Sequence, residues 1–313
     1  MADPTRTIEV KPLTLHIGAE IAGIDLSRPL AAESRKAVSD ALLKWKVVFF
    51  RGQHLDHAGH VAFARQMGAP TIGHVVFGHI EDFPEIYSVA KFRTAQTHRA
   101  ARAQRPWTGW HTDITAALNP PKASILRGVT IPPYGGDTLW TNLAVAYQGL
   151  SETMRGIVDG LRGIHRFQAP AGGKSQAYDE SVRRREMETE HPIVRVHPET
   201  GERLLFVSPS FLKSIVGLTS RESELMLDLL WEHVVRPEYT VRFKWEMGDI
   251  AMWDNRATAH LAPTDIFDSD FDRQLYRITL LGDVPVGVDG RPSVALKGEP
   301  IRSVETELTA AAG

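Results

Sequence analysis

Cysteine is absent from the 313 residues of this sequence. Without thiols the chain has no disulfide, no cysteine-ligated zinc site, no iron–sulfur cluster and no cysteine nucleophile. A bound metal ion must therefore sit on histidine, aspartate, glutamate or backbone oxygen ligands. That restriction favours hard cations and cations that bind imidazole.

The sequence also lacks an excess of charge and a long apolar run. Its formal net charge is -2, so it has no overall positive field of the kind that nucleic-acid and anionic-membrane binders carry. No apolar stretch is long enough to cross a bilayer, and Met1–Lys11 lacks the apolar region of a signal peptide. We expect a cytoplasmic protein whose partner is a small molecule, with no nucleic-acid or membrane partner.

Short apolar runs rich in β-formers recur between turn residues. Between two of them, His197–Glu202 contains proline and glycine and predicts a hairpin. Runs of this length and spacing are typical of a largely antiparallel sheet structure. The predicted strands are Leu13–Ile24, Val47–Phe50, Glu85–Val89, Ala123–Ile131, Ile193–Val196, Leu204–Val207, Tyr239–Phe243, Ile250–Trp253 and Leu275–Leu281.

Three segments have the apolar spacing of helices instead: Ala31–Lys46, His57–Met67 and Thr219–Arg236. The third opens with a capping box formed by Thr219 and Glu222. It is predicted to bury one stripe made of Leu225, Leu229 and Val235.

The domain organisation follows from these elements. We expect one domain over residues 1–285, with a helical layer outside a β-barrel or sandwich. After Asp283 the chain becomes rich in glycine, proline and polar residues, so residues 286–313 are predicted to be a C-terminal tail.

His-x-Asp pairs are the first candidate metal ligands. Two residues apart on a strand point to the same side, so both side chains can reach one ion. His111–Asp113 has this spacing, but so has His54–Asp56, and His79–Glu81 resembles it. Asp56 is better explained as the N-cap of the next helix, and His79 precedes a loop. An Fe(II) site needs two imidazoles and one carboxylate, so a third ligand must come from elsewhere.

The remaining histidines receive structural interpretations. His165 and His197 are predicted to be hydrogen-bonded polar residues, and His191, which precedes Pro192, a loop residue. His233 lies near the end of a predicted helix, where the helix dipole favours a cation.

Five blocks of the chain, in the same order, resemble the taurine dioxygenase (TauD/TfdA) family of Fe(II)/2-oxoglutarate dioxygenases. The resemblance extends from about Leu15 to Asp283. It implies a mixed α+β fold with a double-stranded β-helix core (jelly-roll, cupin-like) flanked by helices. The blocks are Val47–Gln53, Trp110–Asp113, Gly135–Trp140, Trp253–His260 and Arg273–Arg277.

The resemblance implies iron on His111, Asp113 and His260, with 2-oxoglutarate chelating the metal. The far carboxylate of the cosubstrate would pair with Arg273 and accept a hydrogen bond from Thr138. A planar guanidinium makes two parallel bonds to a carboxylate and so fixes its orientation. The polar residues between Trp253 and His260 are interpreted as supporting groups.

Three further positions match residues that contact the cosubstrate or substrate in relatives. Arg277 is expected on the same strand face as Arg273, near the C1 end of 2-oxoglutarate and the anionic head of the substrate. A structural ion pair is its alternative role. His74 matches a substrate-contacting histidine, with a loop histidine as the alternative. The backbone N–H of Ile114 matches a group that meets the substrate anion.

The implied function is hydroxylation of an aliphatic C–H bond, with O2 as second cosubstrate and succinate and CO2 as products. The substrate is expected to be a small anion: a sulfonate, an alkyl sulfate or a carboxylate. A natural-product intermediate is an alternative substrate, and a zinc hydrolase on the same ligands and a non-catalytic binding protein are alternatives from other classes. The basic segment Lys91–Thr108 is expected to be a loop that could suit a larger or more anionic substrate, with a solvated loop that has no such role as the alternative. Family members commonly form homo-oligomers.

Overall fold

The computed structural model describes residues 8–74, 78–90, 105–167 and 186–312. In these ranges none of the helices is both long and apolar enough to cross a membrane. The helices are α1 (Ala32–Trp45), α2 (His57–Met67), α4 (Leu143–Gln148), α5 (Glu152–Val158), α7 (Ser220–Val234), α8 (Val304–Ala312) and the 3-10 turns η1 (Pro237–Tyr239) and η2 (Thr264–Asp268). The first strands are β1 (Glu9–Pro12), β2 (Ala19–Ala22), β3 (Val47–Phe50), β4 (Tyr87–Ala90), β5 (Ala123–Thr130), β6 (Thr138–Asn142), β7 (Arg162–Arg166) and β8 (Glu188–Pro192). The later strands are β9 (Val194–Val196), β10 (Arg203–Leu205), β11 (Leu212–Ile215), β12 (Thr240–Phe243), β13 (Ile250–Asp254), β14 (Thr258–Leu261), β15 (Gln274–Leu280) and β16 (Val294–Lys297).

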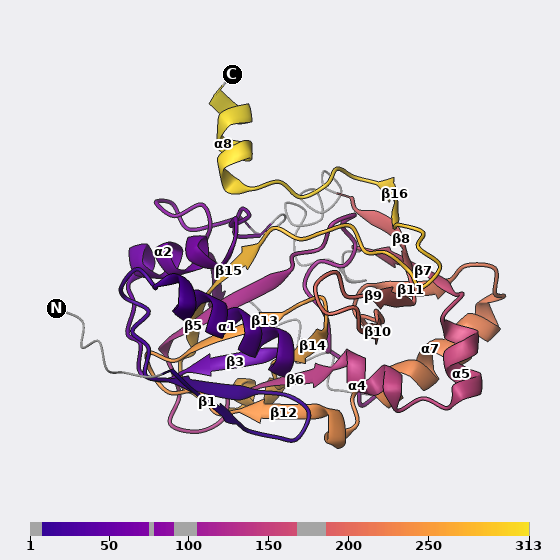
Figure 1. The fold of residues 1–313 in the computed structure, drawn as a ribbon, viewed down its shortest axis with the longest axis horizontal. Helices are drawn as coiled ribbons and strands as arrows, with labels where there is room; N and C mark the ends of the chain where they lie inside the picture. Colours follow the sequence, from indigo (N-terminus) through magenta and orange to yellow (C-terminus); the bar gives the residue numbers. More distant parts are fainter. Residues whose placement is uncertain (1–7, 75–77, 91–104, 168–185, 313) are drawn as a thin grey trace.

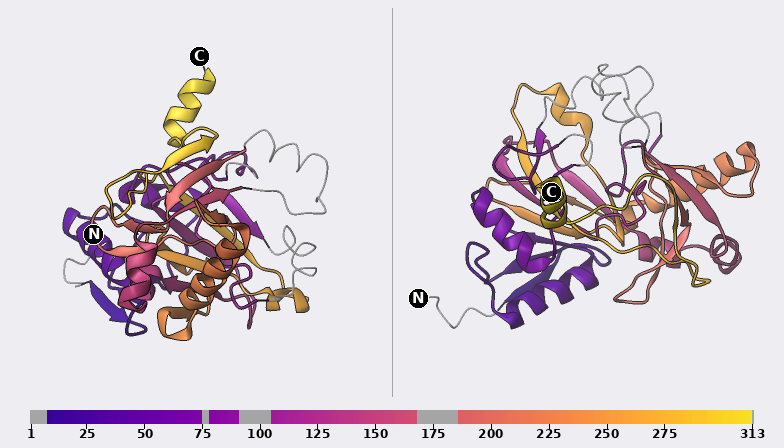
Figure 2. Two further views of the ribbon diagram at one scale, coloured as in Figure 1. Left: turned by 90° about the vertical axis from the view of Figure 1, so that its right-hand side faces the viewer. Right: turned by 90° about the horizontal axis from the view of Figure 1, so that it is seen from above.

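A seven-stranded sheet in the order β1-β2-β3-β13-β5-β15-β4 forms the first layer (Figure 1). All its pairs are antiparallel except β2 with β3. The opposing strands form the sheets β12-β6-β14 and β11-β7-β8-β16 and the hairpin β9-β10. This mixed α+β arrangement is the double-stranded β-helix that the sequence predicts. In Figure 2 α1 and α2 lie together on one side of the strands.

Strand β3 shows why the chain folds in layers. All four of its residues are buried, because alternate side chains enter different cores. Phe49 points toward the second sheet, where its ring stacks on Phe243 at 4.0 Å and meets the edge of Trp140 at 5.4 Å. Phe50 points the other way and packs with Phe63 of α2. The run of large apolar residues thus joins the sheet both to its helices and to the second sheet.

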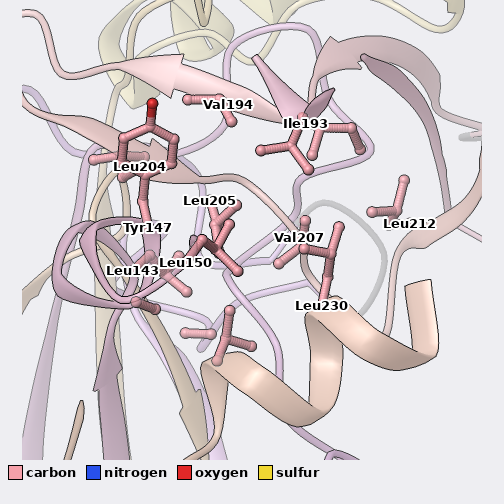
Figure 3. Packing of buried hydrophobic residues seen from close by; sticks show 14 of the residues in the cluster. Leu143, Tyr147, Leu150, Ile193, Val194, Leu204, Leu205, Val207, Leu212 and Leu230 are labelled. Atoms are coloured by element: carbon pink, nitrogen blue, oxygen red, sulfur yellow. The ribbon is translucent and has the colours of Figure 1, made fainter. Parts of the chain in front are cut away.

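A third core lies between α4, α7 and the hairpin β9-β10 (Figure 3). The hairpin and the capping box of Thr219 and Glu222 are confirmed. The predicted stripe on α7 is wrong, because Leu225 and Leu229 are 53% and 45% exposed. The hydroxyl of Ser223 accepts the backbone N–H of Ile215 at 2.8 Å and turns a polar residue inward. The buried side chains of the helix are therefore Ser223, Leu227, Leu230 and Val234.

Two other local predictions are corrected. The segment Leu13–Ile24 is not one strand: Leu13 donates its N–H to the carbonyl of Gly18, whose φ of +85° turns the chain between β1 and β2. His191 is not in a loop but lies fully buried in β8. The other predicted strands overlap observed ones to within a few residues, as β3 and β5 do.

The segment after residue 285 packs on the body. Strand β16 pairs with β8, and Val304 donates its N–H to the carbonyl of Pro70 at 2.9 Å. Only then does α8 project outward, as Figure 1 shows. The division of the chain into a domain ending at residue 285 and a tail stays a prediction.

Candidate metal centre

A backbone bridge brings the two histidines of the candidate site together. His111 donates its N–H to the carbonyl of His260 at 2.9 Å, and His260 of β14 donates back at 2.7 Å. In the described part of the chain, His111, Asp113 and His260 are the one group of three side chains placed to share a metal ion. Their ligand atoms all lie within 4.8 Å of one another. The structure therefore brings together the triad predicted from the sequence.

Both imidazoles are in the neutral form that metal ligands require. Nδ1 of His111 lies 3.0 Å from the carbonyl of Gly109, so this nitrogen donates and the lone pair is on Nε2. Burial lowers the pKa of His111, and burial together with the neighbouring His111 ring lowers the pKa of His260 well below its usual value. Nε2 of His260 lies 4.0 Å from Oδ1 of Asp113.

Asp113 is an ionised carboxylate although it is only 2% exposed. Burial alone would raise its pKa, but the positive charge of Arg277 and the nearby rings of His260 and His111 hold the pKa below its usual range. Nη1 of Arg277 donates to Oδ1, and the hydroxyl of Ser124 donates to Oδ2 at 2.6 Å. The carboxylate is therefore available to a cation at neutral pH.

A chain of hydrogen bonds with one possible direction fixes Oδ2 of Asp113. The indole N–H of Trp253 donates to Oδ1 of Asn255 at 2.7 Å, so the amide group of Asn255 faces Ser124 and donates to its hydroxyl at 2.8 Å. Because the hydroxyl of Ser124 accepts this bond, it donates its own hydrogen bond to Oδ2 of Asp113. Sequence reasoning missed Ser124, although a serine within the apolar run Ala123–Ile131 was a usable signal for a buried hydrogen bond.

Arg273 provides a second charged element of the site. It lies just before β15, is 8% exposed and makes no ion pair with a carboxylate of the described ranges. Its Nε donates to the carbonyl of Gly136 at 2.8 Å, and Nη2 lies 3.4 Å from Oγ1 of Thr138. Burial lowers the pKa of Arg273 to about 10, so the guanidinium is charged at neutral pH. A buried cation without a carboxylate partner fits an anionic ligand.

Thr138 has a free proton for such a ligand. Its Oγ1 accepts the indole N–H of Trp245 at 3.0 Å in addition to the contact from Arg273. These donors occupy the lone pairs and leave the hydroxyl proton to be donated elsewhere. Arg273 and Thr138 together therefore suit a carboxylate group.

The other predicted residues gather around Asp113 and Tyr87. Arg277 pairs with Asp113, keeps its Nε unpartnered and lies 5.4 Å from the ring centre of Tyr87. The ring of His74, which is buried, lies 5.0 Å from that of the same tyrosine. Ile114 follows Asp113 with a φ of +45°, and within the described ranges nothing accepts its N–H. The ion pair foreseen as an alternative for Arg277 is thus present.

Comparison with known proteins identifies the family. Residues 9–279 match the family described as "Taurine catabolism dioxygenase TauD, TfdA family". The chain belongs to this family. An alpha-ketoglutarate-dependent sulfate ester dioxygenase from Pseudomonas putida is 41% identical over 295 residues, covering 91% of this chain and 93% of that protein. An alkylsulfatase from Acinetobacter baylyi is 39% identical over 297 residues, covering 92% and 89%. The structure of a taurine dioxygenase from Burkholderia xenovorans has 63% identity and a TM-score of 0.83, covering 94% of this chain and 96% of that one.

As a member of the TauD/TfdA family, the protein is a 2-oxoglutarate-dependent dioxygenase that uses Fe(II) and has a His-Asp-His metal site. The donor set fits this metal, since two imidazoles and one carboxylate are the ligands of non-haem Fe(II) oxygenases. The buried guanidinium of Arg273, which pairs with no carboxylate in the described part of the chain, fits the dicarboxylic cosubstrate.

The competing motifs in this TauD/TfdA member have structural roles. Asp56 caps α2 by accepting the N–H of Gly59 at 2.7 Å, as predicted. Nδ1 of His79 lies 2.8 Å from the carbonyl of Ile80. Most of the predicted basic loop, residues 91–104, lies outside the described ranges; Arg105 lies 3.8 Å from Asp228 of α7.

Replacement of Ser124 by alanine should weaken metal binding about tenfold, the low end of the effect of losing a hydrogen bond to a metal-ligating carboxylate. Without the hydroxyl, Oδ2 of Asp113 loses its buried donor and the carboxylate can rotate. The measurement is competitive titration of the apoprotein with Fe(II) under anaerobic conditions. Ser27→Ala, at an exposed site, is the control. Unchanged affinity in Ser124→Ala would remove Ser124 from the site.

Proposed function

We propose that this dioxygenase hydroxylates an aliphatic C–H bond of a small anionic substrate, a sulfate ester or a sulfonate, with a carboxylate as a further possibility. The observation that carries the proposal is the buried Arg273, which has no carboxylate partner among the described residues, beside the hydroxyl of Thr138, in a chain that also holds the metal triad. The similarity to a sulfate ester dioxygenase and to an alkylsulfatase supports the substrate class.

In this proposal His111, Asp113 and His260 hold the iron. Arg273 pairs with the far carboxylate of 2-oxoglutarate, and Thr138 donates a hydrogen bond to it. When bound, the iron supplies oxygen activation, which couples decarboxylation of 2-oxoglutarate to hydroxylation of the substrate. The chain's own contribution is orientation, because a misplaced C–H bond would waste the oxidant.

The proposed substrate contacts lie at the other side of Asp113. Arg277, once the metal shares the charge of Asp113, is available to the C1 end of the cosubstrate and to the anionic head of the substrate. The backbone N–H of Ile114 and the ring of His74 are the remaining groups for that head. Support comes from the missing acceptor for Ile114 among the described residues and from the position of His74 beside Tyr87.

The test is a screen of alkyl sulfates, alkyl sulfonates and carboxylates with Fe(II), 2-oxoglutarate and O2, read as succinate release. Hydroxylation next to the heteroatom of a sulfate ester or sulfonate gives an unstable product, so we expect equimolar sulfate or sulfite and an aldehyde. Anaerobic addition of Fe(II) and 2-oxoglutarate should give the weak visible charge-transfer band of the chelate. Succinate release that none of these anions stimulates would contradict the proposed substrate class.

The same screen also distinguishes the proposed reaction from the two alternatives raised by the sequence, a zinc hydrolase and a dioxygenase acting on a natural-product intermediate. A zinc hydrolase would release sulfate without O2 or 2-oxoglutarate. Stimulation by a neutral natural-product intermediate alone would place the substrate outside the anions. We also propose a homo-oligomer located in the cytoplasm; light scattering after size-exclusion chromatography tests the first point.

A further inference from the structure

The turn after the metal-ligating aspartate is buried and strained. Residues Ile114 to Ala117 are at most 4% exposed, and Ile114 has a φ of +45°. A β-branched residue rarely adopts this left-handed conformation, which persists only when the surroundings impose it. The backbone carbonyls of such a buried turn also need donors from elsewhere in the protein. We call residues 113–119 the ligand turn.

Three side chains of the second layer supply contacts to the ligand turn. Nε2 of His191, on β8, lies 2.8 Å from the carbonyl of Thr115 and 3.2 Å from that of Ala117. Thr189, also on β8, donates to the carbonyl of Ala116 at 2.8 Å. Nδ1 of His165, on β7, lies 2.9 Å from the hydroxyl of Thr115. Strands β7 and β8 therefore hold the turn in place.

The tautomer of His191 is fixed by a residue far along the chain. Because carbonyls only accept, Nε2 carries the proton and Nδ1 is an acceptor. The hydroxyl of Ser293 lies 2.6 Å from Nδ1 and is the donor for it. The carbonyl of Pro285 also lies 2.9 Å from this hydroxyl, but it already accepts the backbone N–H of Ser293 at 2.8 Å, so the shorter contact to Nδ1 takes the hydroxyl hydrogen. Ser293 thus orients the imidazole of His191, which donates to the backbone carbonyls of the ligand turn.

A second residue of the same C-terminal segment, Ile301, is hydrogen-bonded to the ligand turn. Asn119 donates to the carbonyl of Ile301 at 2.9 Å and accepts the N–H of Ile301 at 2.8 Å. The side chain of Ile301 packs against the apolar cluster that contains Ile114, Ala116 and Ala117. Two anchors eight residues apart therefore join residues 285–303 to the turn, and we call this segment the C-terminal strap.

The strap is itself firmly attached to the body. Strand β16 pairs with β8 between the two anchors, and Nη2 of Arg162 donates to the carbonyl of Pro292 at 2.8 Å. Figure 1 shows β16 beside β8, ahead of the projecting α8. The strap lies entirely beyond residue 279, where the match to the family ends.

We propose that the C-terminal strap positions the ligand turn, with Ser293, His191 and Asn119 as positioning residues that keep the backbone N–H of Ile114 aimed at the substrate anion. The strap therefore controls how the substrate sits, not how 2-oxoglutarate binds, because Ser124 and Arg277 hold Asp113 independently and the Arg273 and Thr138 pair lies outside the contacts of the strap. The part about the substrate rests on the proposed function; the part about the turn does not.

The test compares His191→Leu, which removes the one N–H donor that two carbonyls of the turn share, with His191→Gln, whose amide N–H group can donate to the same carbonyls. Hydrogen–deuterium exchange of peptides covering residues 110–119 is measured on the full-length apoprotein. In His191→Leu we expect exchange at least about tenfold faster, from the loss of buried hydrogen bonds, and near-normal exchange in His191→Gln. Ser293→Ala and Asn119→Ala should each give a smaller increase, of about threefold.

Turnover gives a second readout that general destabilisation would not produce. The substrate KM and the succinate formed per substrate oxidised should rise several-fold in His191→Leu, with the KM for 2-oxoglutarate within twofold of wild type. The controls are Lys297→Ala, in an exposed strap pair, and a chain ending at Val304, which keeps both anchors. Both controls should behave as wild type.

Unchanged exchange of the ligand turn in His191→Leu, Ser293→Ala and Asn119→Ala would overturn the proposal, and so would an equal rise in both KM values. Should His191→Leu fail to fold, Ser293→Ala and Asn119→Ala decide the matter. Faster exchange without any anion-stimulated turnover would leave the anchoring role of the strap intact and contradict the proposed substrate class instead.

Discussion

Replacement of Asp113 by asparagine should reduce Fe(II)-dependent succinate formation by about 10³-fold or more, because the metal loses its one anionic protein ligand. It should also destabilise the apoprotein. The guanidinium of Arg277 is 8% exposed and would lose the one carboxylate that it pairs with among the described residues, leaving an uncompensated buried charge. Breaking a buried pair in this way costs about 3–5 kcal/mol. Succinate assays and urea unfolding of the apoprotein measure the two effects.

The other His-x-Asp motif offers a matched control. Asp56→Asn makes the same chemical change at the N-cap of α2, where asparagine caps as well as aspartate does. The unfolding free energy should therefore stay within about 0.5 kcal/mol of wild type, and turnover should be unchanged. Substantial turnover in Asp113→Asn, or an equal loss in Asp56→Asn, would contradict the assignment of the metal site.

The main strands can be predicted from the sequence because apolar runs mark them locally. The metal triad can be predicted because two ligands are close in the sequence and the third lies in a block that follows the family's order. Runs such as Val47–Phe50 are apolar on both faces and can only be buried strands. His111 and Asp113 are two residues apart, and His260 was found through the order of the family's blocks, since nothing in the spacing of the residues themselves indicates that His260 meets them. The backbone bridge between residues 111 and 260 is a long-range contact that only the folded structure reveals.

The predictions that are wrong concern residues whose role depends on a distant partner. On α7 the sequence offers two apolar stripes, and the bond from Ile215 to Ser223 decides which one is buried. His191 next to a proline resembles a loop residue, yet its hydrogen-bond partners are about 75 and 100 positions away in the chain. Periodicity carries no information about such contacts.

The segment after residue 285 shows a different reason for a missed feature. All four residues of β16 are exposed although three of them are apolar, and the run is short and stands in a polar, Gly/Pro-rich context, so the sequence predicts no strand there. The strand exists because its backbone pairs with the edge of β8, and backbone groups are the same in every sequence apart from proline. Composition therefore says little about whether such a segment is attached to the body.

Replacement of Arg273 by methionine should raise the KM for 2-oxoglutarate about 10²-fold or more without lowering the stability of the apoprotein. Two charge-assisted bonds to a carboxylate are worth about 3–6 kcal/mol together when each contributes about 1.5–3 kcal/mol. In the apoprotein, however, the guanidinium is buried without a carboxylate partner in the described ranges, and burial lowers its pKa to about 10. Methionine keeps much of the side-chain volume and removes that unfavourable charge.

Loss of cosubstrate affinity with retained or increased stability is the pattern of a residue kept for ligand binding, and a structural arginine would give the opposite pattern. The KM for 2-oxoglutarate and thermal unfolding of the apoprotein are measured side by side. Arg203→Ala, which removes an exposed partner of Asp159, is the control and should change neither value appreciably. Arg273→Lys should recover part of the affinity, because an ammonium keeps the charge but makes no paired bonds. A marked fall in stability with an unchanged KM would show that the guanidinium of Arg273 serves the fold and that another cation binds the far carboxylate.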